Sequence, residues 1–482
     1  MQPQLRRPWT TSLRQFELLL LFGGVFAVAW PAVFGVRPRR GIASGLLFAA
    51  LIAQLQIEGF RWQLIPMYAA ALGLIIGDIV FLDRNLRWSN RIARGIFGMA
   101  GLLLISSPAW LFPVPLLPSP SGPETIGTMT LQFSDPENRE VYGLGPGRPR
   151  ELVVQVYYPA LPDSETERGQ IHPQWSEIGP ELARSLGLPS WFLDHLGYTE
   201  SHTYEGLTVA PGTYPVVVYS HGWLGYRSIA LNQIETLVSN GYVVIAPDHT
   251  FRAVATVFDD GELVPYDVNA LPDPAGFTAD EYQEFPEVML ESYSNDLTAV
   301  LNALDAGPDG PFGAILDSID LTRVGLYGHS MGGGAAVSVC LTDERCDAVL
   351  GMDPWVEHLP DQTLALTATK PAMFLRSAEW DERPNDAILR GIAERSESTT
   401  YWIGIDGSGH NDFLFYPLLS PLADEMGLRG PIAAGRMIPI INQYLVGFFD
   451  VFLLDTGPAS INTVSFDEVA LEVLRPDQED SE

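Results

Sequence analysis

Apolar and polar positions divide the chain into two parts with different periodicity. Four mostly apolar runs fill the first part: Leu18 to Val36, Gly41 to Ile57, Trp62 to Leu82 and Gly95 to Pro113. Each run is close to the roughly 20 residues that a membrane-spanning helix needs. A signal peptide would supply only one such run, and no strand pattern lies between the four. The pattern predicts an all-α transmembrane region of about four helices over residues 1–114.

The arginines between these runs predict the orientation of the region. One side holds seven of them: Arg37, Arg39, Arg40, Arg84, Arg87, Arg91 and Arg94. The opposite side holds four: Arg6, Arg7, Arg14 and Arg61. Positively charged loops are retained in the cytoplasm. We therefore expect a multi-pass membrane protein whose termini, and with them the second part of the chain, lie on the extracytoplasmic side.

Short strand-like runs alternate with helix-like stretches in the second part, after a Pro-rich linker at residues 115–124. Such alternation over residues 125–482 predicts an α/β domain, with a mostly parallel sheet covered by helices on both faces. The long insertion from Arg252 to Phe285 is expected to lie over the functional site as a lid or as a wall of its pocket. The apolar stretch from Met437 to Leu454 contains Asn442, Gln443 and Asp450, and we expect it to be a core helix rather than a fifth membrane span.

The stretch Gly328-His329-Ser330-Met331-Gly332 carries the strongest chemical signal. An apolar run precedes it, and a small-residue helix pattern follows it. In this context G-x-S-x-G predicts a nucleophile elbow, which is a sharp strand-to-helix turn that lifts the serine hydroxyl above the sheet. Glycines flank the serine because side chains there would collide with neighbouring backbone. Ser330 is the predicted nucleophile.

An acid and then a histidine follow Ser330, in the order that α/β-hydrolases use. Asp353 and His410 each stand after a strand-like run, and His410 is the last histidine of the chain. An imidazole must take the serine proton, and a carboxylate must hold that imidazole in the correct tautomer. Asp381 also follows a strand-like run and is the alternative acid. The sequence predicts the α/β-hydrolase fold with a triad of Ser330, Asp353 and His410.

Two backbone amides are predicted to bind the negative oxygen that forms during ester cleavage. One is normally the amide after the nucleophile, here Met331. The other comes from a loop after an earlier strand, and the loop 220–225 follows such a strand. The amide of Trp223 is therefore the second expected donor of the oxyanion hole. His221 in the same loop is expected to have a structural role.

Four sequence blocks together resemble the platelet-activating-factor acetylhydrolase family of the plasma and intracellular type II class. They are Tyr219-Ser220-His221-Gly222 with Tyr226-Arg227, the GHS-x-GG block from Gly328 to Gly333, Met352-Asp353-Pro354-Trp355, and Gly409-His410. The resemblance covers roughly residues 150–450. It implies a triad of Ser330, Asp353 and His410, and so favours Asp353 over Asp381. It also implies calcium-independent hydrolysis of short or oxidised acyl chains at the sn-2 position of phospholipids.

One departure keeps the substrate open. The family commonly has Phe after the nucleophile, whereas Met331 followed by three glycines is similar to bacterial cutinase-like polyester hydrolases. A cutinase-like lipase or polyester esterase is therefore the enzymatic alternative. A membrane binding or signalling protein with a degenerate hydrolase pocket is the alternative from another class. The intact order of the three triad residues argues against the degenerate pocket.

The net charge of the two parts of the chain indicates which partners to expect. Residues 1–114 carry 11 basic and 4 acidic groups, whereas the rest of the chain carries 17 and 55, a net charge of −38. So negative a domain argues against binding nucleic acid and favours a lipid or other ester as the partner. We expect no metal site and no cofactor.

Cys340 and Cys346 are the only cysteines, and they form either a small-loop disulfide outside the cytoplasm or two packed thiols.

Overall fold

The computed structural model describes residues 14–34, 41–80, 88–143, 147–457, 461 and 465–475. Contacts divide the chain into two compact units. The helical unit holds the described residues up to Leu116 together with Asp194–Thr199 and Leu418–Ala423, and the sheet unit holds the others from Leu117 onward. Seven of the eleven arginines that were counted for the predicted orientation lie outside the described residues: Arg6, Arg7, Arg37, Arg39, Arg40, Arg84 and Arg87.

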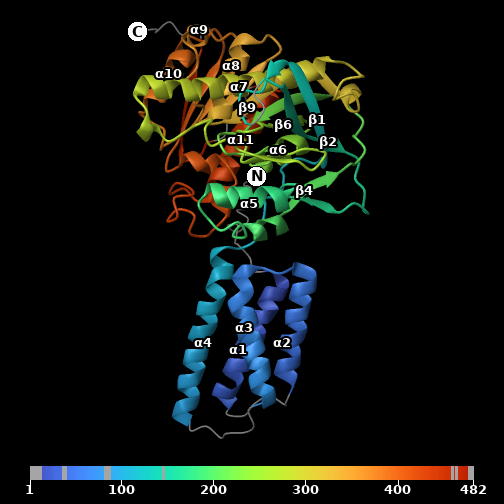
Figure 1. Ribbon diagram of the computed structural model, residues 1–482, viewed down its shortest axis with the longest axis vertical. Helices are drawn as coiled ribbons and strands as arrows, with labels where there is room; N and C mark the ends of the chain where they lie inside the picture. The colour runs from blue at the N-terminus through green and yellow to red at the C-terminus, as the bar shows by residue number, and fades with distance from the viewer. Residues whose placement is uncertain are drawn as a thin grey trace. The chain divides into compact units, whose positions relative to one another are not determined.

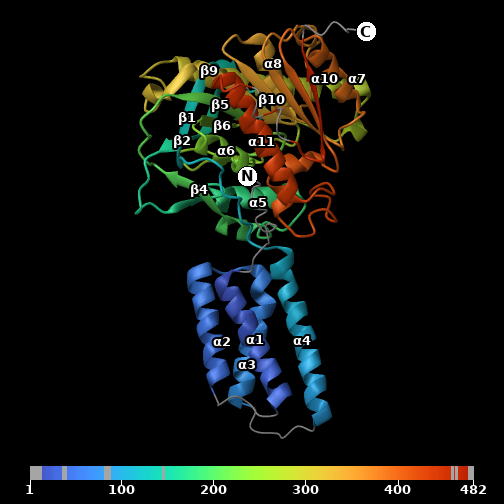
Figure 2. The same cartoon turned by 180° about the vertical axis from the view of Figure 1, so that it is seen from behind.

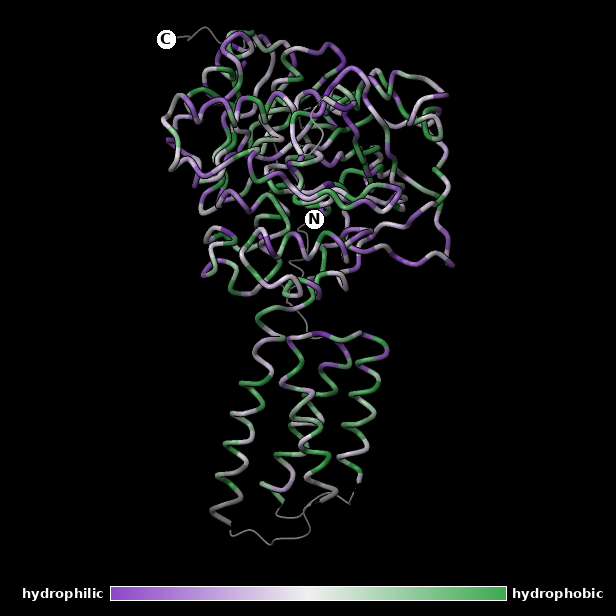
Figure 3. Tube along the Cα trace, viewed as in Figure 1, coloured by the Kyte–Doolittle hydropathy of each residue, from purple (hydrophilic) through white to green (hydrophobic). Residues whose placement is uncertain are grey.

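Each of the four apolar runs forms a helix in the helical unit. The helices are α1 Gln15–Phe34, α2 Ile42–Ala53, α3 Ile65–Val80 and α4 Trp88–Leu111. Hydrophobic residues predominate along all four (Figure 3). Leu20, Leu47, Leu64 and Met67 are buried in a common core, while other large apolar side chains, such as Phe22, Phe97 and Leu104, are more than half exposed.

The lengths of these helices differ from the expectation of four spans. Among the described residues, only α1 is both long and apolar enough to cross a bilayer by itself. The shorter apolar helices are Ile42–Glu58, Trp62–Gly77 and Gly95–Leu111. The first of these ends in a π-helical turn at Gln54–Glu58, where two glutamines and a glutamate interrupt the apolar run. Four helices are therefore present, and one meets the criterion for a membrane span.

Eleven strands of the sheet unit form one sheet in the order β13-β12-β11-β10-β9-β5-β6-β2-β1-β4-β3 (Figures 1 and 2). The strands are β1 Thr125–Arg139, β2 Pro149–Ala160, β3 Arg168–Gln170, β4 Glu200–Glu205, β5 Tyr214–Ser220, β6 Val243–Asp248, β9 Ile319–His329, β10 Ala348–Met352, β11 Ala372–Ser377, β12 Thr400–Ile405 and β13 Val469–Leu474. The six strands β6, β5, β9, β10, β11 and β12 pair in parallel. Their carboxyl ends therefore meet at one edge, where open α/β sheets bind ligands.

Helices cover both faces of this sheet, as predicted. The sheet unit contains α5 Trp175–Ser185, α6 Leu231–Ser239, α7 Ala279–Asp305, α8 Met331–Thr342, α9 Asp361–Leu364, α10 Pro384–Glu394 and α11 Ala434–Leu453. Helix α7 packs on α8 and lies in front of the sheet in Figure 1, whereas α11 packs on α6 and lies in front in Figure 2. The mostly parallel sheet between helices confirms the predicted α/β architecture.

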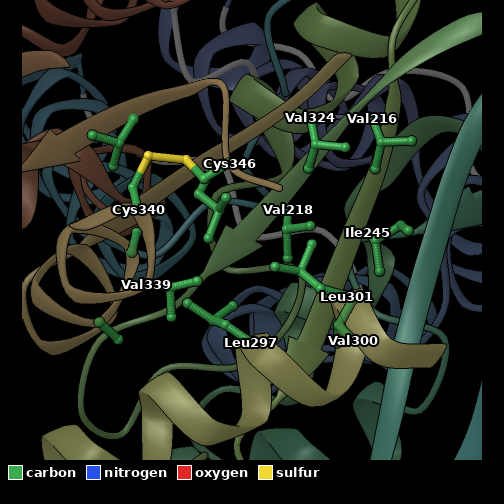
Figure 4. Packing of buried hydrophobic residues seen from close by; sticks show 14 of the residues in the cluster. Val216, Val218, Ile245, Leu297, Val300, Leu301, Val324, Val339, Cys340 and Cys346 are labelled. Carbon is green, nitrogen blue, oxygen red and sulfur yellow. A yellow bond between two sulfur atoms is a disulfide. The ribbon is translucent and has the colours of Figure 1, made fainter. Parts of the chain in front are cut away.

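One hydrophobic core of the sheet unit lies between the parallel strands and α7 (Figure 4). Val216 and Val218 from β5 and Val324 from β9 face Leu297 and Leu301 from α7. Beside this cluster, a disulfide joins Cys340 near the end of α8 to Cys346 just before β10. The structure therefore has a disulfide between these cysteines rather than two packed thiols.

Two segments of the sheet unit bear on earlier expectations. The insertion 252–285 is only partly a loop, because it holds a hairpin of β7 Ala255–Val257 and β8 Leu263–Pro265 and the start of α7. A capping box starts α7, since Thr278 Oγ1 accepts the Glu281 amide and the Glu281 carboxylate accepts the Thr278 amide. Helix α11 packs against β9 and β10, which confirms that the apolar stretch after residue 436 is a core helix.

Candidate active site

Ser330 stands at the turn between β9 and α8. Its φ of 54° and ψ of −124° are a sparsely populated backbone conformation for a residue with a side chain, and such strain persists only where surrounding structure imposes it. Here the Ser330 amide donates to Met352 O at 3.0 Å, and the Ser330 carbonyl accepts from the amides of Gly334 and Trp355, each at 2.9 Å. The turn is therefore fixed by α8 and by the neighbouring strand β10.

Glycine is required beside the serine because the chain is crowded there. A Cβ on Gly332 would lie 2.3 Å from Ser220 O, and one on Gly334 would lie 2.1 Å from Trp355 O. Both contacts are with backbone, which cannot move aside as a flexible side chain could. The small-residue pattern after the serine thus lets α8 approach the ends of β5 and β10 closely.

The structure joins Asp353 and His410. His410 begins a short 3-10 turn after β12, and its Nδ1 lies 2.9 Å from Asp353 Oδ2. The Asp353 carboxylate also accepts the amide of Ser377 at 2.7 Å and its hydroxyl at 2.6 Å. Asp353 is 1% exposed, so three hydrogen bonds hold a buried carboxylate against the imidazole.

Asp381, the alternative acid, lies elsewhere. Its carboxylate pairs with Arg376 at 2.6 Å, and its side chain is 62% exposed. Arg376 also binds Asp386 at 2.5 Å and lies over the ring of Trp402. Asp381 is therefore part of a surface ion-pair network, and of the two acids only Asp353 contacts His410.

The hydroxyl of Ser330 is not joined to this pair by a hydrogen bond. Among the described residues, no hydrogen bond to Ser330 Oγ is present. Catalytic hydrogen bonds are often long before a substrate binds and tighten only in the complex. The geometry thus unites the predicted acid and base, and it presents the predicted nucleophile on its elbow with a free hydroxyl.

Three neighbours of His410 were not predicted from the sequence. The indole of Trp380 stacks on the imidazole at 4.4 Å with an interplanar angle of 9°. The Glu379 carboxylate accepts the His410 amide at 2.9 Å, and His329 Nε2 donates to the His410 carbonyl at 2.9 Å. Trp380 and Glu379 lie in the loop after β11, which the sequence marked only through Asp381. The sequence shows His329 in the G-H-S motif, but it does not indicate that His329 binds the carbonyl of His410.

Burial sets the protonation of this cluster. It raises the pKa of Asp353 to about 6, against the hydrogen bonds from Ser377. It also lowers the pKa of His410 to about 4, with Glu379 raising and Arg383 further lowering that value. Burial lowers the pKa of His329 to about 3. Near neutral pH, Asp353 is therefore ionised and both imidazoles are neutral.

The two amides expected in the oxyanion hole are both available. Met331 is the first residue of α8 and lies beyond the strand β9. Among the described residues, neither the Trp223 amide nor the Met331 amide donates a hydrogen bond. The loop of Trp223 also lies against the elbow, because a Cβ on Gly222 would be 3.1 Å from Ser330 Cβ. Two unpaired donors thus belong to segments that meet beside the serine.

Comparison with known proteins identifies the family. The family model described as "Platelet-activating factor acetylhydrolase, isoform II" matches residues 140–263 and 289–454, which together make up more than half of the chain. The chain belongs to this family. The matched segments include Trp223, Ser330, Asp353 and His410. Family membership makes the chain a carboxylic ester hydrolase, and it confirms the resemblance found in the sequence.

Individual relatives each cover about 70% of the chain. The platelet-activating factor acetylhydrolase of Gallus gallus is 22% identical over 368 residues, which cover 70% of this chain and 83% of the relative. The probable 1-alkyl-2-acetylglycerophosphocholine esterase of Arthroderma benhamiae is 24% identical over 389 residues, or 72% and 92% of the two chains. The solved structure of a ferulic acid esterase from Streptomyces cinnamoneus is similar with a TM-score of 0.59 at 25% identity, covering 74% of this chain and 99% of the esterase.

Proposed function

We propose that the chain is a membrane-anchored serine ester hydrolase that uses Ser330, His410 and Asp353 as its triad. The observation that carries this proposal is the 2.9 Å hydrogen bond between His410 Nδ1 and Asp353 Oδ2. Ser330 on its elbow is joined through its backbone amide to Met352, the residue just before Asp353. Because Nδ1 carries the proton shared with Asp353, Nε2 has a free lone pair. Nε2 is then the atom that can take the proton of Ser330.

The proposed reaction follows from these roles. Ser330 Oγ adds to the ester carbonyl carbon while its proton passes to His410 Nε2, and the carbonyl oxygen becomes negative between the Trp223 and Met331 amides. Collapse of this intermediate expels the alcohol, which takes the proton from Nε2, and leaves an acyl-serine. Water then repeats the sequence and releases the acid.

Phospholipids with a short or oxidised sn-2 acyl chain are the proposed substrates. The support is the family match together with two relatives named for acetylated glycerophosphocholine or platelet-activating factor. A cutinase-like esterase acting on neutral or polymeric esters is the second candidate. Met331 after the nucleophile and the structural likeness to a ferulic acid esterase favour it.

A substrate panel separates these candidates. The full chain, in detergent micelles, would receive a short-acyl sn-2 phosphatidylcholine, its long-acyl counterpart, a p-nitrophenyl ester and a polyester film, each with and without a calcium chelator. We expect preference for the short-acyl phospholipid with no effect of the chelator. Preference for the simple ester or the film would favour the cutinase-like candidate. If no ester is hydrolysed, or if Ser330→Ala hydrolyses each ester as fast as the wild type, both enzymatic candidates fail. The remaining candidate is then a non-catalytic binding protein.

The proposed membrane region comprises residues 1–114, followed by a linker at 115–124 and a catalytic domain at 125–482. Its support is the exposed apolar surface of the four helices, since a soluble protein rarely exposes so many large apolar side chains together. The disulfide between Cys340 and Cys346 supports an extracytoplasmic catalytic domain, because disulfides persist in oxidising compartments. The larger number of arginines in the loops on the other side of the predicted membrane region agrees with this orientation.

Membrane fractionation tests the anchor. The full chain is expected to stay in the membrane pellet after extraction with alkaline carbonate, because several apolar helices hold it in the bilayer. N-terminal sequencing of the recovered protein should find α1 still attached. A soluble protein that lacks residues 15–34 would show instead that α1 is a cleaved signal sequence. Protease added to sealed cells should digest the catalytic domain if it lies outside.

The rate should depend on pH through the Asp353–His410 pair. The active form needs an ionised Asp353 and a neutral His410, and burial places the higher of their two pKa values at about 6. The pair gains a proton as the pH falls through this value, so kcat/KM should be constant above about pH 7 and fall about tenfold per unit below pH 6. A profile that stays flat down to pH 5, with activity regained on return to pH 7.5, would contradict this assignment.

A further inference from the structure

A second Ser-His-Asp array lies buried in the sheet unit. Ser220 Oγ at the end of β5 is 2.9 Å from His249 Nε2, and His249 Nδ1 is 2.9 Å from Asp296 Oδ2 on α7. The three residues are 0%, 0% and 1% exposed. A substrate cannot reach the Ser220 hydroxyl, so this array needs a role other than nucleophilic attack.

The hydrogen bonds of the array have a fixed direction. Burial alone would raise the pKa of Asp296, but the charge and hydrogen bonds of Arg150, at 2.7 and 2.8 Å, lower it below its usual range. Burial lowers the pKa of His249 to about 3, so its ring is neutral. His249 therefore donates Nδ1–H to the ionised Asp296 and accepts the Ser220 hydroxyl at Nε2.

This array continues into the loop that carries Trp223. The backbone amide of His249 donates to His221 Nε2 at 3.1 Å, and His221 Nδ1 donates to the Gly222 carbonyl at 2.8 Å. Burial lowers the pKa of His221, so its ring is neutral with one donor and one acceptor, and both are used. His221 thus links the segment after β6 to the residue just before Trp223.

The rest of the loop is held from the same side. The Leu224 amide donates to Arg252 O at 3.1 Å, and Gly225 donates to Gly222 O at 3.0 Å. Leu224 has a φ of 56°, a left-handed conformation that needs such support in a non-glycine residue. These hydrogen bonds use the amides of Leu224 and Gly225 and the carbonyl of Gly222. Among the described residues, none of them involves the Trp223 amide, which is therefore free to bind the oxyanion.

We propose that His221 is a positioning residue that aims the Trp223 amide at the oxyanion, with the Ser220–His249–Asp296 array as its rigid base. The proposal rests on the proposed function, in which that amide stabilises the tetrahedral intermediate. Misalignment of such a donor weakens binding of the transition state more than binding of the substrate. His221 thereby acts on catalysis without touching the substrate.

Graded substitutions of His221 in the full chain test this role. In His221→Gln the side-chain carbonyl can still accept the His249 amide, whereas His221→Leu removes both hydrogen bonds. We expect kcat per titrated active site to fall about 10- to 100-fold in His221→Leu, with KM within threefold of the wild type and partial recovery in His221→Gln. His172→Leu is the matched control, because His172 is equally buried and packs on Tyr226 next to this loop, while its own hydrogen bond is with the Gln174 amide.

A pair of ligands gives a readout that lost stability alone would not move. An alkyl trifluoromethyl ketone adds a serine hydroxyl and forms an oxyanion, whereas the matching secondary alcohol does not. His221→Leu should weaken the ketone in step with kcat/KM and leave the alcohol nearly unchanged. Equal weakening of both ligands, or a kcat per titrated site within threefold of the wild type, would overturn the proposal.

Two further arms keep the test decisive. If His221→Leu does not fold, Ser220→Ala removes one oxygen from the array, and its loss of kcat is compared with that of Ser239→Ala, an equally buried serine on α6. A loss in Ser220→Ala no larger than in Ser239→Ala would overturn the proposal. Failure of the proposed function is seen separately, because Ser330→Ala would then keep its activity and the wild type would give no titratable serine.

Discussion

Replacing Ser330 with alanine is expected to lower kcat by at least about 10⁴-fold while the protein remains folded. The hydroxyl supplies the attacking oxygen of the proposed reaction, and the oxyanion donors alone leave only a small residual rate. The Ser330 side chain makes no hydrogen bond among the described residues, so its loss removes no contact that stabilises the fold. Initial rates with the preferred ester, together with a thermal unfolding curve, provide the measurement.

Ser338→Ala is the matched control for this substitution. Ser338 lies two turns along the same helix, at 9% exposure, so it tests the effect of losing a hydroxyl from α8 away from the elbow. Its kcat should stay within twofold of the wild type. A fluorophosphonate probe should label the wild type and the Ser338 variant but not Ser330→Ala. Labelling that survives in Ser330→Ala would place the reactive serine elsewhere.

Asp353→Asn is expected to lower kcat by about 10⁴-fold. The Ser377 amide donates to Asp353 Oδ1, whereas the Ser377 hydroxyl and His410 Nδ1 share Oδ2. The asparagine oxygen would remain at the Oδ1 position, because the amide can only donate, while the hydroxyl can turn and accept. Its NH₂ group would then face His410 Nδ1 and donate to it. That hydrogen bond stabilises the tautomer with the proton on Nε2, which cannot accept the proton of Ser330.

Asp381→Asn is the matched comparison, since the same atom is exchanged at the competing acid. It should change kcat less than twofold, because Asp381 is 62% exposed and pairs with Arg376 rather than with His410. Exposed ion pairs of this kind contribute about 1 kcal/mol or less, so the melting temperature should also change little. A large loss in Asp381→Asn with near-normal activity in Asp353→Asn would reverse the assignment of the acid.

The central strands and the elbow could be predicted because their signals are local. Buried parallel strands are mostly apolar runs, and β5, β10, β12 and the part of β9 from Val324 onward follow this pattern. The glycines around Ser330 reflect backbone contacts that any sequence with this turn must permit. Parallel pairing then brings Asp353 and His410 to the same edge as the serine, although they are distant in the chain.

Other features depend on contacts that leave no local pattern. Trp380 lies on His410 only because β11 and β12 are neighbours, and nothing in its own segment indicates a partner. The strand β13 alternates between half-buried and exposed positions at the edge of the sheet, so its apolar signal is weak. The start of α7 did have a local signal, the capping box of Thr278 and Glu281, which the long polar insertion obscured.

The rings around His410 restrict how its protons can move. Trp380 lies parallel to the imidazole at 4.4 Å, and His329 lies at 4.3 Å from it. Rotation about the Cβ–Cγ bond would drive the imidazole into these rings and break its bond to Asp353. The two nitrogens therefore cannot exchange places during a catalytic cycle. A single atom, Nε2, has to receive the proton of the attacking group and return it to the leaving group in both halves of the reaction.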